Sequence, residues 1–279
     1  MAEILYRGKK YSSLGELPVP KIRETAALLG LLRQPRPKRP EIIKHKFGNL
    51  DFVSYKGANL PPSPETFHLA DVVGQVINRV NRQQDRDLIL VDIGTGSGVI
   101  PITVASRVEG VSNRNVFVGT DISGRALEVA AINVAANSAP VELRKRDMFD
   151  DLVLEFGRVD VLVFNPPFYY GNRIPRKVRT TTFIPQLAVD GGEDSLDYYR
   201  KFFEGATETL KSSGIAVVQI QDYKLREISE IAAGAMRGAE IAALKGPRGR
   251  YSILMAGDKG LVDVAREIAS QNQLVGSRI

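Results

Sequence analysis

The sequence predicts an α/β fold: a doubly wound, seven-stranded, mostly parallel sheet with one antiparallel strand, preceded by a small N-terminal extension. From residue 87 onward, short apolar runs alternate with amphipathic stretches, a pattern typical of a parallel sheet covered by helices on both faces. Glycines cluster after the first apolar run, as at a ligand-binding turn between a strand and a helix. Only Gly246-Pro-Arg-Gly249 separates the last two runs, and so short a connection joins antiparallel strands.

Composition narrows the class of protein. The chain has 279 residues, of which 43% are hydrophobic and 25% are charged, and these are the proportions of a soluble globular protein. It has no cysteine, which excludes disulfides, thiolate metal sites and cysteine nucleophiles. It has only two histidines, so we expect no metal site. No apolar run is long enough to cross a bilayer and the N-terminus lacks a signal-peptide pattern, so we expect a cytoplasmic protein without a membrane partner.

Two parts are predicted, an N-terminal extension over residues 1–60 and a larger domain over residues 61–279. Apolar spacing in the extension predicts a helix over residues 20–32, followed by a basic, proline-rich linker. Two alternating runs around Gly48-Asn49 then predict a β-hairpin over residues 42–55.

The larger domain opens with a predicted helix from Pro64 to Arg82, capped by Ser63. Strands are expected at Leu88–Asp92, Asn115–Asp121, Val141–Arg146, Val159–Asn165, Ile215–Ile220, Glu240–Leu244 and Tyr251–Ala256. Helices are expected at Val99–Arg107, Ser123–Asn137, Leu196–Leu210, Lys224–Met236 and Leu261–Gln271.

The glycine-rich turn is the first candidate ligand site. Gly94, Gly96 and Gly98 follow a buried strand, where glycine permits tight turns and close approach of the backbone to a ligand. Amide protons at the start of the next helix bind polar or anionic groups. Asp121 ends the second strand, where an acidic residue accepts from ribose hydroxyls. After the third strand, Asp147 can accept from an adenine amino group while Met148 packs on the ring.

A second candidate site follows the fourth strand, at Asn165-Pro-Pro-Phe168. Two successive prolines stop the sheet ladder and stiffen the backbone. Asn165 can accept a hydrogen bond from an NH2 group, the carbonyl of Pro166 is a second acceptor, and Phe168 offers a flat face. We therefore expect a substrate with a planar amine or amide. The expected substrate-binding residues are Pro167, Tyr169, Arg173 and Arg176, in and after this motif.

Taken in order, Asp92-x-Gly-x-Gly-x-Gly98, Asp121, Asp147 and Asn165-Pro-Pro-Phe168 resemble the Rossmann-like class I S-adenosylmethionine-dependent methyltransferases. Pro64-Glu65-Thr66, Asn133 and the stretch from Asp190 to Arg200 are similar to the HemK/PrmC family, which methylates a glutamine side-chain amide in translation release factors. The resemblance implies S-adenosylmethionine as cofactor. The implied cofactor-binding residues are Asp92, Gly94, Thr95, Gly96, Gly98, Asp121, Ile122, Asp147, Met148 and Asn165, and the implied catalytic residues are Asn165, Pro166 and Phe168.

The acceptor stays open at this point. A protein glutamine in a release-factor-like substrate is the leading hypothesis. RNA is the alternative, methylated at adenine N6 or guanine N2. Relatives with that activity have Phe at the Phe168 position, the net charge is +6, and the loop after the motif is basic, with Arg173, Arg176, Lys177 and Arg179. A small-molecule N-methyltransferase and a non-catalytic cofactor-binding scaffold are further alternatives. The sequence does not indicate the oligomeric state.

Overall fold

The computed structural model describes residues 4–6, 9–11, 42–55, 62–84, 87–108, 115–167, 196–246 and 249–276. The expected helix over residues 20–32 and the linker after it lie outside these ranges. The predicted boundary between residues 60 and 61 stays a prediction.

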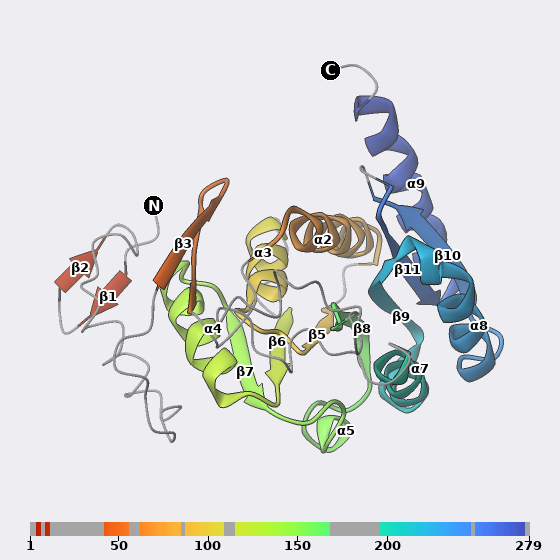
Figure 1. Ribbon diagram of the computed structural model, residues 1–279, viewed down its shortest axis with the longest axis horizontal. Helices are drawn as coiled ribbons and strands as arrows, with labels where there is room; N and C mark the ends of the chain where they lie inside the picture. The colour runs from red at the N-terminus through yellow and green to blue at the C-terminus, as the bar shows by residue number, and fades with distance from the viewer. Residues whose placement is uncertain are drawn as a thin grey trace.

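The larger part of the molecule is built on one seven-stranded sheet, with the order β10-β11-β9-β8-β5-β6-β7 (Figure 1). Its strands are β5 (Ile89–Ile93), β6 (Val116–Asp121), β7 (Val141–Lys145), β8 (Val159–Phe164), β9 (Leu210–Gln221), β10 (Glu240–Lys245) and β11 (Tyr251–Gly257). Strand β11 runs antiparallel to both of its neighbours, whereas the other adjacent pairs are parallel. The predicted mostly parallel sheet with one antiparallel strand is therefore confirmed.

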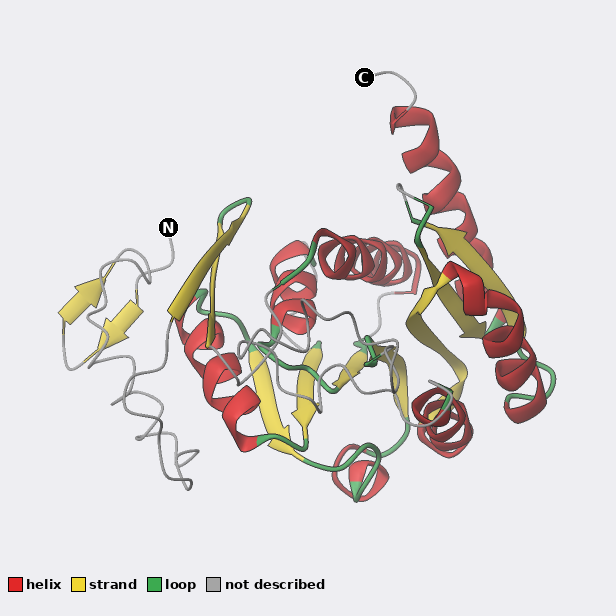
Figure 2. Ribbon diagram, viewed as in Figure 1, coloured by secondary structure: helices red, strands yellow, loops and turns green. Residues whose placement is uncertain are grey.

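Helices cover both faces of this sheet (Figures 1 and 2). One face carries α2 (Pro64–Gln84), α3 (Val99–Arg107) and α9 (Lys259–Gly276), and the other carries α5 (Leu152–Phe156), α7 (Asp197–Thr209) and α8 (Leu225–Ala235). Helix α4 (Gly124–Ala136) packs beside α3 and against β6 and β7, and a short 3-10 helix, η4 (Asp222–Lys224), follows β9. Within the described ranges, no helix is long and apolar enough to span a bilayer.

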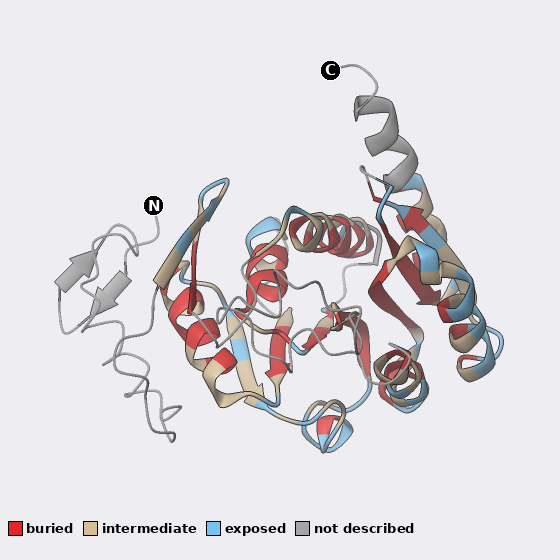
Figure 3. Ribbon diagram, in the orientation of Figure 1, coloured by how far each residue is buried: buried red, intermediate tan, exposed pale blue. Residues whose placement is uncertain are grey.

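Strand β8 shows why the sheet needs helices on both faces. All six of its residues are buried (Figure 3). Val161 and Val163 belong to the core under α2 and α9, while Leu162 and Phe164 belong to the core under α7 and α8. Successive side chains of a strand point to opposite faces, so the apolar run Val161–Phe164 contributes to two cores at once.

The predicted β-hairpin is confirmed as β3 (Ile42–Phe47) and β4 (Leu50–Tyr55), joined by Gly48 with a positive φ of 57°. Its aromatic side chains pack on the larger domain, where the Phe47 ring stacks on Phe67 of α2 at a centroid distance of 3.8 Å. A shorter antiparallel pair, β1 (Ile4–Tyr6) and β2 (Lys9–Tyr11), had not been predicted.

Strand β9 begins at Leu210, five residues before the expected start at Ile215, so the predicted extension of the preceding helix through Leu210 is wrong. The segment Lys211-Ser-Ser-Gly214 resembles a turn in sequence, but the Lys211 ammonium lies 2.8 Å from the buried Asp160 carboxylate. A Cβ on Gly214 would lie 3.0 Å from the Asp160 carbonyl oxygen. Tertiary contacts with β8 therefore draw this polar segment into the sheet. Helix α5 was also missed, and α9 is longer than expected.

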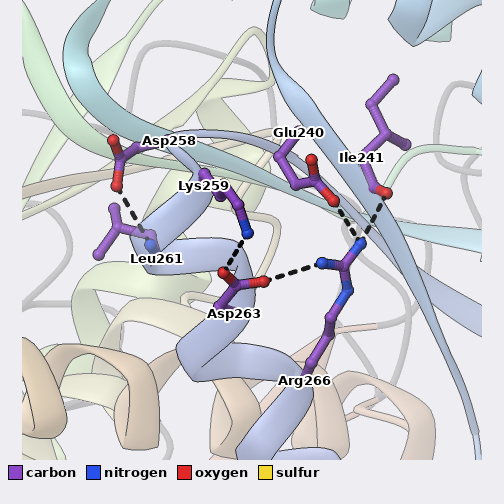
Figure 4. Close-up of polar contacts among 7 residues, drawn as sticks. All are labelled: Glu240, Ile241, Asp258, Lys259, Leu261, Asp263 and Arg266. Carbon is purple, nitrogen blue, oxygen red and sulfur yellow. Dashed lines mark hydrogen bonds and ion pairs between the residues drawn. The ribbon is translucent and has the colours of Figure 1, made fainter.

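Charged side chains connect the edge strand β10, here called the outer edge of the sheet, to helix α9 (Figure 4). The Arg266 guanidinium donates to a Glu240 carboxylate oxygen at 2.6 Å and to the Ile241 carbonyl at 3.3 Å. Asp263 accepts from Arg266 at 2.9 Å and from the Lys259 ammonium at 2.7 Å. The pKa of Asp263 is lowered, chiefly by the hydrogen bond from Lys259 and then by the one from Arg266.

Candidate active site

The strand register brings three of the predicted motifs to one edge of the sheet. Ile93 at the end of β5 lies opposite Thr120 of β6 on one side and Phe164 of β8 on the other. The residues that follow, Gly94, Asp121 and Asn165, therefore leave the sheet next to one another. The chain order reverses between β5 and β8, and open α/β sheets bind ligands at such a switch point.

The turn after β5 depends on glycine for two different reasons. Gly94, Gly96 and Gly98 have φ values of 67°, 57° and 77°, a region that other residues enter at a cost. A Cβ on Gly98 would lie 3.3 Å from the Ala130 Cβ, so this glycine lets α3 pack closely on α4. A Cβ on Gly96 would meet no heavy atom of the described residues within 4 Å. The space above Gly96 is therefore open to a ligand.

Asp121 holds this turn in place. One carboxylate oxygen accepts from the Gly96 amide at 2.9 Å and the other from the Ser123 amide at 2.8 Å. Burial raises the pKa of Asp121, and these two hydrogen bonds oppose the rise. Each carboxylate oxygen has a second lone pair, so both can still accept from ribose hydroxyls. The Thr95 amide donates to the Thr120 carbonyl at 2.7 Å, which joins the turn to β6 a second time.

Asp92 lies within strand β5, two residues before Gly94. It is fully buried, and neither oxygen of its carboxyl group has a hydrogen-bond partner in the described part of the chain. Burial raises the pKa of Asp92 to about 8, the nearby Thr95 side chain opposes the rise, and the charge of Asp121 adds to it. A buried carboxyl group without partners is costly to ionise unless a cation arrives beside it.

The turn after β7 lies on the other side of Asp121. The Arg146 amide donates to the Asp121 carbonyl at 3.1 Å, which brings the following Asp147 and Met148 to the same edge. Met148 has a φ of 46°, an uncommon conformation for a residue with a side chain. Ile122 is 45% exposed although its side chain is large and apolar. These features suit a flat ring that packs over this edge.

Among the described residues, Asn165 is held from one side. Its Nδ2 donates to the Thr66 hydroxyl at the start of α2, at 3.2 Å. Its Oδ1 is buried and accepts no hydrogen bond from the described residues. The predicted capacity to accept from an NH2 group is therefore still available, and Thr66 is a contact that the sequence reasoning had not assigned. The motif Pro64-Glu65-Thr66 in the sequence was the only indication of it.

Asn133 is the second unassigned contact. Its Nδ2 donates to the Ser97 carbonyl in the glycine-rich turn at 2.8 Å and to the Val53 carbonyl of β4 at 3.0 Å. Its Oδ1 accepts from the Val53 amide at 2.8 Å. One buried carboxamide thus joins the hairpin to the turn.

Phe168, Tyr169, Arg173 and Arg176 lie outside the described residues, so their predicted roles stay predictions. Pro166 is buried and Pro167 is partly buried. No group of three or more His, Asp or Glu side chains within the described ranges is placed to hold a metal ion.

Comparison with known proteins identifies the family. A family model described as "Methyltransferase small domain" matches residues 75–188. The release factor glutamine methyltransferase of Flavobacterium psychrophilum is 31% identical over 206 residues, 72% of this chain and 68% of that protein. The chain belongs to the release factor glutamine methyltransferase family. It is therefore a class I S-adenosylmethionine-dependent methyltransferase, as its motifs predicted.

Other members of this family give the same picture. The Bacillus subtilis (strain 168) protein is 30% identical over 202 residues, 71% of this chain and 67% of its own length. The Bacillus cereus protein is 36% identical over 169 residues, but the match spans only 55% of its length.

Solved structures of lower identity share the fold. A Thermus thermophilus 16S rRNA N2 G1207 methyltransferase, solved with AdoMet and guanosine, has a TM-score of 0.56 at 16% identity, covering 81% of this chain and 52% of that one. An S-adenosylmethionine-dependent methyltransferase from Agrobacterium tumefaciens has a TM-score of 0.51 at 16% identity, covering 81% and 73%. The Rossmann-like methyltransferase fold is thus confirmed.

Proposed function

We propose that this methyltransferase transfers a methyl group to the side-chain amide nitrogen of a glutamine in a release factor. The observation that carries the proposal is the similarity to release factor glutamine methyltransferases over about 70% of the chain, with 30% and 31% identity. The acceptor-binding end of the site supports it. The Oδ1 of Asn165, which has no partner among the described residues, is a hydrogen-bond acceptor, which suits the NH2 group of a primary amide.

The residues around the glycine-rich turn fit S-adenosylmethionine. When bound, the cofactor supplies a sulfonium methyl group, which is a strong electrophile. Asp121 would accept from the ribose hydroxyls, and the space above Gly96 would admit the nucleoside. Ile122 and Met148 would pack on the adenine ring while Asp147 accepts from its amino group. Asp92 would face the cationic methionine end, because its carboxyl group has no other described partner.

The task of the chain is to prepare the amide nitrogen, whose lone pair is delocalised into its carbonyl group. Hydrogen bonds from the acceptor NH2 to Asn165 Oδ1 and the Pro166 carbonyl would orient the nitrogen and favour pyramidalisation. The cofactor would supply the methyl group to this nitrogen, with its sulfur keeping the electron pair of the broken sulfur–carbon bond, and the nitrogen would lose one proton to solvent. In-line placement contributes much of the rate, and in favourable cases it lowers barriers by about 7–11 kcal/mol.

The direct test supplies radiolabelled S-adenosylmethionine and a purified release factor. We expect label in the protein, and mass spectrometry of its peptides should place one methyl group on a glutamine. In cell extract, the label should be lost with protease and should survive ribonuclease. Label that is found only in ribonuclease-sensitive material would overturn the protein acceptor and establish the RNA alternative.

A salt series sharpens the same test. Binding of RNA releases counterions from each contacted phosphate, so its affinity falls steeply with salt. A protein acceptor should show a shallower dependence. Charge reversal of Arg173 and Arg176 to Glu tests whether the basic loop borders the substrate entrance.

A further inference from the structure

We propose that Thr66 is a positioning residue that fixes which end of the Asn165 carboxamide faces the methyl acceptor. This inference rests on the proposed function, because it assigns the acceptor to Asn165. It goes beyond that function, because it assigns a role in orienting Asn165 to a residue of helix α2 that lies 99 positions before Asn165 in the chain.

A carboxamide has two ends of similar shape and opposite hydrogen-bonding character. Asn165 Nδ2 donates to Thr66 Oγ1 at 3.2 Å, and Oδ1 therefore points to the other side, where it is buried without a described partner. A half-turn about the terminal side-chain bond would exchange the two ends. The NH2 group would then face the acceptor, and two donors would meet without an acceptor between them.

The Thr66 hydroxyl is itself held in place by the helix cap. Ser63 Oγ accepts from the Thr66 amide at 3.2 Å and lies 3.1 Å from Thr66 Oγ1. When the Thr66 hydroxyl donates to Ser63, its lone pairs are left to accept from Asn165. The helix behind this cap is firmly packed, because Leu69, Ala70 and Val73 are buried in the core. The acceptor for Asn165 Nδ2 is therefore set by a rigid element.

The decisive comparison is between Thr66→Val and Thr66→Ser. Valine has the shape of threonine without its hydroxyl, so both carboxamide orientations become populated in Thr66→Val. We expect kcat to fall about tenfold, the loss of one neutral hydrogen bond, with little change in KM or cofactor affinity. Thr66→Ser keeps the hydroxyl and should restore kcat to within about twofold of wild type. Wild-type kcat in Thr66→Val would overturn the proposal.

Two controls separate positioning from folding. Thr103 is a buried threonine of α3 whose hydroxyl has no described partner, so Thr103→Val makes the same chemical change away from Asn165 and should leave kcat unchanged. In an Asn165→Ala background, Thr66→Val should cause no further loss, because the two residues act as one unit. Equal and additive losses would show that Thr66 acts elsewhere.

A spectroscopic measurement keeps the inference testable if release factor is not the acceptor. In nitrogen-15-labelled protein, the side-chain NH2 resonances of Asn165 are those absent from Asn165→Ala. They should shift in Thr66→Val and return close to their wild-type positions in Thr66→Ser. Identical resonances in wild type and Thr66→Val would overturn the positioning role whatever the substrate is. Unmethylated release factor together with the expected shifts would overturn only the proposed function.

Discussion

Two regions of this sheet, the outer edge at β10 and the carboxyl ends of the central strands β5 and β8, use charged and polar side chains in opposite ways. At the outer edge, Glu240, Asp263 and Arg266 are solvent-accessible, and each is satisfied by a neighbour. At the carboxyl ends of β5 and β8, here called the inner edge, Asp92 is buried and Asn165 is partly buried, and both keep buried acceptor atoms without a described partner. The pKa shifts follow the same division, since the pKa of Asp263 is lowered by its partners while burial raises that of Asp92.

This contrast indicates where the molecule gives up stability for function. An unsatisfied buried acceptor costs about 1–3 kcal/mol, and more if it is charged. An exposed, fully paired cluster costs nothing of this kind and also contributes little. We therefore expect the polar groups of the inner edge to gain partners when the cofactor and the acceptor bind.

The largest expected effect comes from Asn165→Ala at the inner edge. Without the acceptor oxygen the amide nitrogen is no longer oriented, and turnover should fall at least about 100-fold, the scale of a misplaced reactant. Cofactor affinity should stay within a few-fold, as measured by calorimetry. Turnover near the wild-type level would mean that Asn165 is an ordinary turn residue. The functional explanation of the inner edge would then no longer include Asn165.

Asp121→Ala should mainly weaken cofactor binding. The variant loses the acceptor of the Gly96 and Ser123 amides together with the proposed ribose contact. Hydrogen bonds to a charged group contribute about 1.5–3 kcal/mol, so we expect affinity to fall about 10- to 100-fold. Calorimetry with S-adenosylmethionine measures it. Asp263→Ala, an aspartate of the outer edge, is the matched control and should bind the cofactor as wild type does.

Asp92→Asn tests the cost of the buried carboxyl group through pH. The folded-state pKa of about 8 lies above the ordinary value of 3.8, so the folded protein binds more protons between these values. Stability from this group is therefore present below about pH 4 and is lost as the pH rises toward 8, by at most about 1.4 kcal/mol per unit. Urea unfolding across this window should show a flatter dependence in Asp92→Asn. Parallel curves for the two proteins would contradict the assignment.

Cofactor binding should also release protons from wild-type protein near pH 7. A cationic ligand beside Asp92 favours its ionised form, so the proton held in the free protein leaves. Calorimetry in buffers with different ionisation enthalpies detects the release. Asp92→Asn should abolish most of it.

The smallest effect is expected for Arg266→Met at the outer edge. Exposed ion pairs are weak and screened by salt, so the melting temperature should drop only slightly, and the difference should shrink in high salt. Turnover and cofactor affinity should not change. Any loss of turnover would mean that the two edges are coupled and that the comparison is too simple.

Much of the fold was predictable because patterns along the chain determine it. The alternation of apolar runs predicted the sheet, and the short Gly246–Gly249 connection predicted its one antiparallel strand. The start of β9 was not predictable, because the buried Asp160 carboxylate that binds Lys211 lies 51 residues away. Helix α5 has only five residues, too few for a clear periodic pattern.

The site was predictable residue by residue but not contact by contact. Glycines and carboxylates at strand ends indicated Gly96, Asp121 and Asn165, since parallel strands end at one edge. The hydrogen bond between Asn165 and Thr66 depends on where the start of α2 lies relative to that edge. No local sequence pattern determines this position. Likewise, only the folded structure shows that the Asp92 carboxyl group is buried without a described hydrogen-bond partner.

The carboxamides of Asn133 and Asn137 have a consequence for how this protein meets other chains. An edge strand normally exposes main-chain groups that can pair with a strand from another molecule and begin aggregation. On β4, Asn137 donates to the Asp51 carbonyl at 2.8 Å and accepts from its amide at 3.0 Å, and Asn133 does the same for Val53. Two side chains from the C-terminal end of α4 and its cap thus take the places of a neighbouring strand, and they close this edge of the hairpin to templated β-sheet growth.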